Sequence, residues 1–154
     1  MVVELRWLLE RQLSWIAAAD GKLAILGPLP IAMLAVSLSS AQQRFSEISW
    51  ADFPVLVSTL FLFLSLFYTK AAITPRLSGP VDSDIFFVRI SSYTTEEFIE
   101  RVRSKSNAEF EEDIMRQIHR NASIAKIKHA NVAKSVMFLS IATPLWLLSI
   151  ATGV

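Results

Sequence analysis

The chain has no cysteine among its 154 residues. This excludes disulfide frameworks, cysteine-based zinc sites and cysteine nucleophiles. Glycine is scarce as well: there are four, and none lies in a GxGxxG or GxxxxGK pattern, so the sequence offers no glycine-rich phosphate loop. Charged residues make up only 19% of the chain and the formal net charge is +1. A partner that is a nucleic acid polymer is therefore not expected, because the chain has no overall basic field.

Apolar residues, in contrast, are abundant. They make up 53% of the sequence, a share that is ordinary for a small polytopic membrane protein. Three stretches without charge stand out, at 23–43, 53–69 and 135–154. Each is long enough to cross a bilayer as a helix, although 53–69 is near the short limit. The sequence thus predicts an all-α membrane protein with three transmembrane helices.

The chain divides into four segments on this basis. Residues 1–22 form an amphipathic helix, whose apolar face carries Leu5, Leu9, Leu13 and Ile16. Residues 23–69 hold two transmembrane helices and a short outer loop, and residues 70–134 form a small, mostly helical region for sensing and coupling. Residues 135–154 are the third transmembrane helix, continuous with the region before it.

The placement of basic residues predicts the orientation. Eleven of the fifteen Lys and Arg residues lie within 70–134, three precede the first span, and the loop at 44–52 has one. Basic residues favour the cytoplasmic side. We therefore expect the N-terminus and residues 70–134 in the cytoplasm of a multi-pass protein.

A cleaved signal peptide is the alternative for the first apolar stretch. Ser39, Ser40 and Ala41 resemble a small-residue cleavage site. However, the leader before this stretch is long and contains acidic residues, and further spans follow. A retained transmembrane helix is the preferred interpretation.

Two helix starts are recognisable in the polar region. Thr94 with Glu97 and Ser106 with Glu109 each have the spacing of a capping box. The second box begins a long helix that continues into the third span. Residues 84–90 have strand-like composition. Along the long helix, one face is expected to carry a stripe of apolar and small residues together with one histidine: Phe110, Ile114, Ile118, Ala122, Ala125, His129, Val132 and Val136.

No constellation of residues suggests catalysis or metal binding. Glu109, Glu111, Glu112 and Asp113 cluster in sequence, but acidic residues in a first helical turn favourably meet the helix dipole. His119 and His129 lie too far apart around a helix to bind one metal ion. We therefore expect a protein that is not an enzyme and uses no cofactor.

The candidate ligand site lies on the long helix. Arg116 and Arg120 are i,i+4 neighbours, so their charges repel unless an anion lies between them. With Gln117, Asn121 and Lys128 nearby, they could bind an anionic group such as a phosphate. The alternative is that Arg116 simply pairs with Glu112, four residues earlier.

Other polar residues mark where the chain enters the membrane. Asp20 and Lys22 flank the entry to the first span, where ionisable groups serve function or anchor the helix. Asp20 could also form a salt bridge with a basic residue such as Lys134. Pro144 interrupts the third span and is expected to kink it.

Three stretches are considered together: Leu13-Ser14-Trp15-Ile16-Ala17-Ala18-Ala19-Asp20-Gly21-Lys22, Asp84-Ile85-Phe86-Phe87-Val88 with Tyr93 and Glu96-Glu97-Phe98, and Gln117-Ile118-His119-Arg120-Asn121-Ala122-Ser123-Ile124-Ala125 with Lys126 and Lys128. They resemble the transmembrane effectors of the Pycsar antiphage defence systems. The resemblance covers most of the chain from about Leu5. The candidate residues for membrane entry and gating are Trp15, Asp20, Lys22 and Pro144.

The resemblance implies a bacterial immune effector in the inner membrane. A partner cyclase would make cyclic CMP or cyclic UMP after phage infection, and the effector, assembled as a homo-oligomer, would then impair the lipid bilayer and cause abortive infection. The chain is too short in its polar region for a cyclic-nucleotide-binding β-roll. The alternative function is a non-gated adaptor or structural membrane subunit that recruits a partner through its helical face.

Overall fold

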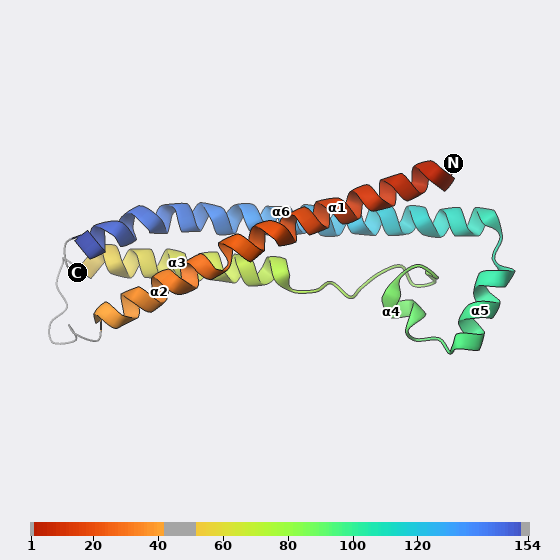
Figure 1. The fold of residues 1–154 in the computed structure, drawn as a ribbon, viewed down its shortest axis with the longest axis horizontal. Helices are drawn as coiled ribbons and strands as arrows, with labels where there is room; N and C mark the ends of the chain where they lie inside the picture. Colours follow the sequence, from red (N-terminus) through yellow and green to blue (C-terminus); the bar gives the residue numbers. More distant parts are fainter. Residues whose placement is uncertain (1, 42–51, 152–154) are drawn as a thin grey trace. The chain divides into compact units, whose positions relative to one another are not determined.

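The computed structural model describes residues 2–41 and 52–151, and every regular element in these ranges is helical. The helices are α1 (Val2–Leu26), α2 (Pro28–Ala41), α3 (Phe53–Ile73), α4 (Phe87–Ile90), α5 (Thr95–Ser104) and α6 (Asn107–Ala151) (Figure 1). The prediction of an all-α fold is confirmed. Trp50, most of the predicted loop at 44–52 and the last three residues of the chain lie outside the described residues.

The chain forms two compact units. The first unit combines Met1–Ala18 with Pro75–Ile127, and the second combines Ala19–Thr74 with Lys128–Val154. Helices α1 and α6 contribute residues to both units. The four segments expected from the sequence were divided where the chain was predicted to enter and leave a membrane, not by contacts within the fold. Their limits stay predictions.

Among the residues that the structure describes, three helical stretches are long and apolar enough to cross a membrane, as predicted: Val2–Ser39, Phe53–Ile73 and Asn107–Ala151. Helix α3 continues four residues beyond the predicted end at Thr69. Its last turn contains Lys70, whose positive charge suits the negative end of a helix dipole. The Thr74 hydroxyl and backbone N–H both donate to the Lys70 carbonyl, which closes the helix.

The first predicted span contains a break between α1 and α2 at Gly27. The Gly27 N–H still donates to the Leu23 carbonyl at 2.8 Å, but a Cβ at position 27 would lie only 2.8 Å from that oxygen. Glycine is therefore required for the close approach. Pro28 then begins α2, a first-turn position where its missing N–H is not needed.

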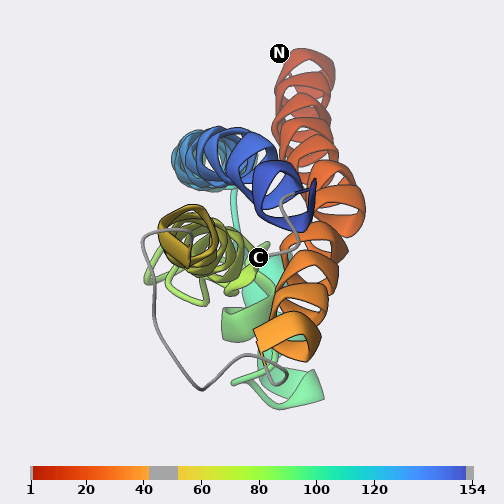
Figure 2. The same ribbon diagram turned by 90° about the vertical axis from the view of Figure 1, so that its left-hand side faces the viewer.

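In the second unit, α3 lies beside the C-terminal part of α6, and both views of the ribbon show this (Figures 1 and 2). The contact face of α3 carries residues at spacings of four and three, all buried: Ser58, Leu62, Ser65, Thr69 and Ala72. Small residues of this kind let transmembrane helices approach closely. The opposite face of α3 exposes large apolar side chains, as a lipid-facing surface does: Phe53, Leu56, Leu60, Phe63 and Phe67.

Hydroxyl groups join α3 to α6 within this apolar core. Ser65 donates to the Ser135 carbonyl at 3.0 Å, and the two hydroxyls lie 3.1 Å apart. Thr69 Oγ1 lies 2.8 Å from Ser135 Oγ. On both sides of this network lie apolar clusters built around Leu23 with Val132 and around Leu62 with Leu139. The network therefore fixes the register of the two helices.

In the first unit, both predicted capping boxes are confirmed. Thr94 accepts from the Glu97 N–H, and Glu97 accepts from the Thr94 N–H. Ser106 and Glu109 make the same reciprocal pair at the start of α6.

Residues 84–90 do not form a strand, although their composition is strand-like. The Ser83 hydroxyl accepts from the N–H groups of Ile85 and Phe86, which turns the chain and starts the short helix α4. The buried Phe86 ring then covers Gly79 so closely that a Cβ there would lie 2.4 Å from it. Strand composition alone could not compete with this local hydrogen bonding.

The apolar stripes expected on α1 and α6 are partly wrong. Ile114, Ala125 and Val132 are buried as expected, but Val136 is exposed, as is Leu13 on α1. The buried positions of α6 instead include polar side chains: Asp113, Gln117, Asn121, Lys128 and Ser135.

Candidate ligand site

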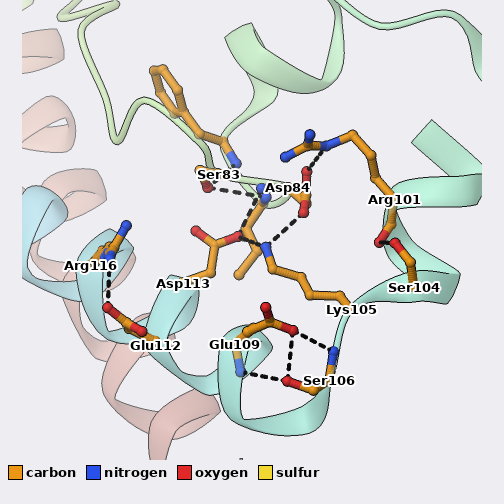
Figure 3. Close-up of polar contacts among 12 residues, drawn as sticks. Ser83, Asp84, Arg101, Ser104, Lys105, Ser106, Glu109, Glu112, Asp113 and Arg116 are labelled. Atoms are coloured by element: carbon orange, nitrogen blue, oxygen red, sulfur yellow. Dashed lines mark hydrogen bonds and ion pairs between the residues drawn. The ribbon is translucent and has the colours of Figure 1, made fainter. Parts of the chain in front are cut away.

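A cluster of paired charges joins the loop before α4, the end of α5 and the first turns of α6 (Figure 3). Asp84 has a side chain that is only 3% exposed, and it accepts from Arg101 Nε at 2.8 Å and Lys105 Nζ at 2.6 Å. Asp113 accepts from Lys105 Nζ at 3.1 Å and from the Asp84 N–H at 2.8 Å. Lys105 therefore bridges two buried carboxylates.

The electrostatic balance of this cluster favours the charged forms. Burial by itself raises the pKa of Asp84, but the hydrogen bonds and charges of Lys105 and Arg101 outweigh it, so the pKa is lowered. Burial likewise acts to lower the pKa of Lys105, while Asp84 and Asp113 raise it further than burial lowers it. The hydrogen bond to Asp84 also raises the pKa of Arg101.

Sequence reasoning missed this cluster. It placed Asp113 in a group of helix-dipole carboxylates and Asp84 in a stretch of strand-like composition. Glu109 does serve the helix start, where the Ser106 hydroxyl and N–H lower its pKa. The available signal for Asp113 was its position directly before Ile114, on the face that α6 buries.

An open cavity of about 320 Å³ lies against the charge cluster. Arg116 is its least constrained cation: among residues 2–41 and 52–151 its one ion pair is with Glu112, and its side chain is 58% exposed. The alternative pairing expected for Arg116 is thus present. The residues lining the cavity are Asp82, Arg101, Lys105, Glu109, Glu112, Asp113 and Arg116.

A second open cavity, of about 490 Å³, shares Asp82, Glu112 and Arg116 with the first. Its remaining walls are mostly apolar and include His119: Pro80, Val81, Met115 and His119. Both volumes lie in the range of small-molecule sites. Arg116 thus lines both cavities, of which the first has charged walls throughout and the second has walls that are partly apolar.

The structure does not bring the five predicted ligand residues together. Arg120 donates from Nε to the Ser78 carbonyl at 2.7 Å and lines neither cavity. Gln117 and Asn121 are buried and bond to each other at 3.0 Å. Lys128 lies in the second unit.

Lys128 pairs there with Asp20. The Asp20 partner suggested by the sequence, Lys134, is wrong: its ammonium instead lies 5.1 Å from the centre of the Tyr68 ring. Lys128 faces the buried side of α6, one turn before Val132, whereas Lys134 is exposed. Helical periodicity therefore selects Lys128.

The other candidate gating residues lie at separate places. Lys22 is exposed on α1. Trp15 is 47% exposed, and the Arg11 guanidinium lies 5.2 Å from its ring centre. Helix α6 continues through Pro144. Within residues 2–41 and 52–151, no group of three or more His, Asp or Glu side chains is arranged to hold a metal ion.

Three membrane-length helices and a smaller polar unit define a multi-pass membrane protein. Residues 4–153 match the family described as the Pycsar effector protein domain, and the chain belongs to this family. Membership implies a cyclic nucleotide signal supplied by a cyclase partner. No curated protein matches the chain, and no solved structure does.

Proposed function

We propose that this protein is a Pycsar-type antiphage effector that senses cyclic CMP or cyclic UMP directly and then impairs the inner membrane. It carries out no reaction on the nucleotide. The first unit would lie in the cytoplasm, where a cyclase product is available. Abortive infection of the phage-infected cell is the outcome.

The observation that supports this proposal best is that Arg116 lines both a charged cavity and a partly apolar one. A cyclic nucleotide has one negative charge on its phosphate and a flat base, and these two parts suit the two cavities. Carboxylates also line the charged cavity, so a phosphate must attract a cation away from its present partner. Arg116 can exchange most easily, because an exposed pair such as Arg116–Glu112 contributes at most about 1 kcal/mol.

Helix α6 offers a physical route from binding to membrane damage. Arg116 lies near the start of α6, and the same helix supplies Ser135 and Leu139 to the transmembrane core. A ligand shifts a conformational equilibrium only through different affinities for the two states. The state that frees Arg116 from Glu112 would bind nucleotide more tightly, and α6 would change its contacts with α3.

Calorimetric titration of the purified protein with cyclic CMP and cyclic UMP tests direct sensing. We expect Arg116→Ala to weaken binding about 10-fold or more, because it removes a hydrogen bond to a charged group. Arg120→Ala is the matched control and should bind normally, since Arg120 lines neither cavity. Absence of binding to the unaltered protein would rule out direct sensing.

Membrane potential in cells tests the second half of the proposal. We expect a pyrimidine cyclase produced beside the effector to collapse the potential, and Arg116→Ala to preserve it. A non-gated adaptor would leave the potential unchanged in both cases.

A further inference from the structure

Helix α5 has an apolar arc that nothing in the described chain covers. Ile99 and Val102 are 43% and 46% exposed, and none of the ten α5 residues is buried. A ten-residue helix of this kind is marginal by itself. It is held in place here by the Thr94 capping box at one end and by Arg101 and Lys105 bound to Asp84 at the other.

The charges beside the apolar arc are segregated along the helix. Glu96 and Glu100 lie i,i+4 to each other, a repulsive spacing, and Arg103 follows in the last turn. In the ranges 2–41 and 52–151 none of these three side chains forms an ion pair. They line, with Ile99 and Ser104, a shallow hollow on the outer side of α5. The other charged side chains of this helix are already engaged, Glu97 in the capping box and Arg101 with Asp84.

This pattern is complementary to itself when reversed. If two copies of α5 pair antiparallel, the acidic N-terminal half of each lies beside the basic C-terminal end of the other. Glu96 then meets Arg103 of the other copy, twice by symmetry, with Ile99 and Val102 between them. A two-fold interface of this kind places the same patch on both subunits.

We propose that α5 is a self-association surface whose partner is the α5 of a second copy of this chain. The pairing is separate from nucleotide recognition, because Glu96, Ile99 and Arg103 line neither of the two cavities beside Arg116. One short helix offers far less than the roughly 800 Å² per partner of a stable interface between soluble proteins. The contact therefore depends on the high effective concentration of chains held in one membrane.

The absence of cysteine makes disulfide mapping in membranes a clean test. Oxidation should crosslink Ile99→Cys, which lies near the two-fold axis. It should also crosslink Glu96→Cys chains to Arg103→Cys chains when the two are produced together, more than either chain to itself. Lys126→Cys, at an exposed position on α6, is the control and should stay uncrosslinked.

Charge exchange gives a second readout that does not depend on oxidation. Arg103→Glu should reduce chemical crosslinking of the chain about 10-fold, and Glu96→Arg in addition should restore it. Equal crosslinking at positions 99 and 126, or no restoration by the double variant, would overturn the proposal. So would protection of the Ile99→Cys thiol from a water-soluble maleimide in vesicles that hold a single chain each, because lipid would then cover the arc.

Discussion

Lys105 Nζ lies 2.6 Å from an Asp84 carboxylate oxygen, and this contact joins the end of α5 to the loop before α4. Both side chains are largely buried. Asp113, a residue of α6, pairs with the same ammonium group. In the first unit, called the polar unit below, ion pairs therefore join α5 and the loop before α4 to the start of α6.

Asp84→Asn should destabilise the first unit by about 1.5–3 kcal/mol, because the mostly buried Lys105 ammonium group then loses one of its two carboxylate partners and keeps only Asp113. Hydrogen exchange of the amides between residues 84 and 113 would report this as faster exchange. Glu112→Gln is the control, since it breaks the exposed pair with Arg116 and should cost less than about 1 kcal/mol. If both variants lost the same stability, the buried ion pairs of Asp84 would contribute no more to stability than the exposed pair does.

The stability of the polar unit should fall at both extremes of pH. Asp84 has a lowered pKa, so its contribution is complete above the ordinary value of about 3.9 and is lost as pH falls through the lowered value. Lys105 has a raised pKa, so its contribution is complete below about 10.4 and is lost as pH rises through the raised value. Denaturant titrations at a series of pH values, followed by circular dichroism, would measure both limbs. The Asp84→Asn variant should lose less stability at low pH than the unaltered protein does. An equal loss in both proteins would mean that other groups cause the loss.

The pair of Asp20 with Lys128 should respond unequally to the loss of its two members. The Lys128 side chain is 11% exposed and that of Asp20 is 48% exposed. Asp20→Asn leaves a mostly buried charge alone and should cost about 1–3 kcal/mol. Lys128→Met leaves a carboxylate that water can reach, and should cost less. Thermal unfolding in detergent would compare them, and the double variant should be more stable than Asp20→Asn alone.

Ser135→Ala should loosen the contact between α3 and α6, because it removes the hydroxyl that both Ser65 and Thr69 contact. Interhelical hydrogen bonds in membranes contribute about 0.6–2 kcal/mol, so the melting temperature in detergent should drop measurably. Ser140→Ala changes an exposed serine on the same helix and should have no effect. A similar drop for both would refute a specific role for the network.

The sequence carried enough information for the local features of the fold. The two capping boxes were predictable because each depends on residues three apart, and the three apolar stretches because span length follows from bilayer thickness. The limits of the helices were less accurate, as the extra turn of α3 beyond Thr69 shows.

Features that depend on distant residues were not predictable in the same way. Nothing local indicates that Asp84 meets Lys105, or that Asp20 meets α6 at all, although helical periodicity favours Lys128 over Lys134 on that helix. Gln117 and Asn121 were expected near a ligand because they lie close to Arg116 and Arg120 in the sequence, yet both are buried and bond to each other. Arg116 was found because repulsion between i,i+4 charges is a local signal, but its cavity is built partly by the loop at residues 80–82.

The hydroxyl network between α3 and α6 also limits how α6 can move along its axis. Ser65 and Thr69 lie one helical turn apart on α3, and both contact Ser135. Because Ser135 lies within hydrogen-bond distance of both, a slide of α6 along α3 in either direction moves it away from one of the two hydroxyls. The contact between the two helices therefore opposes axial sliding in both directions.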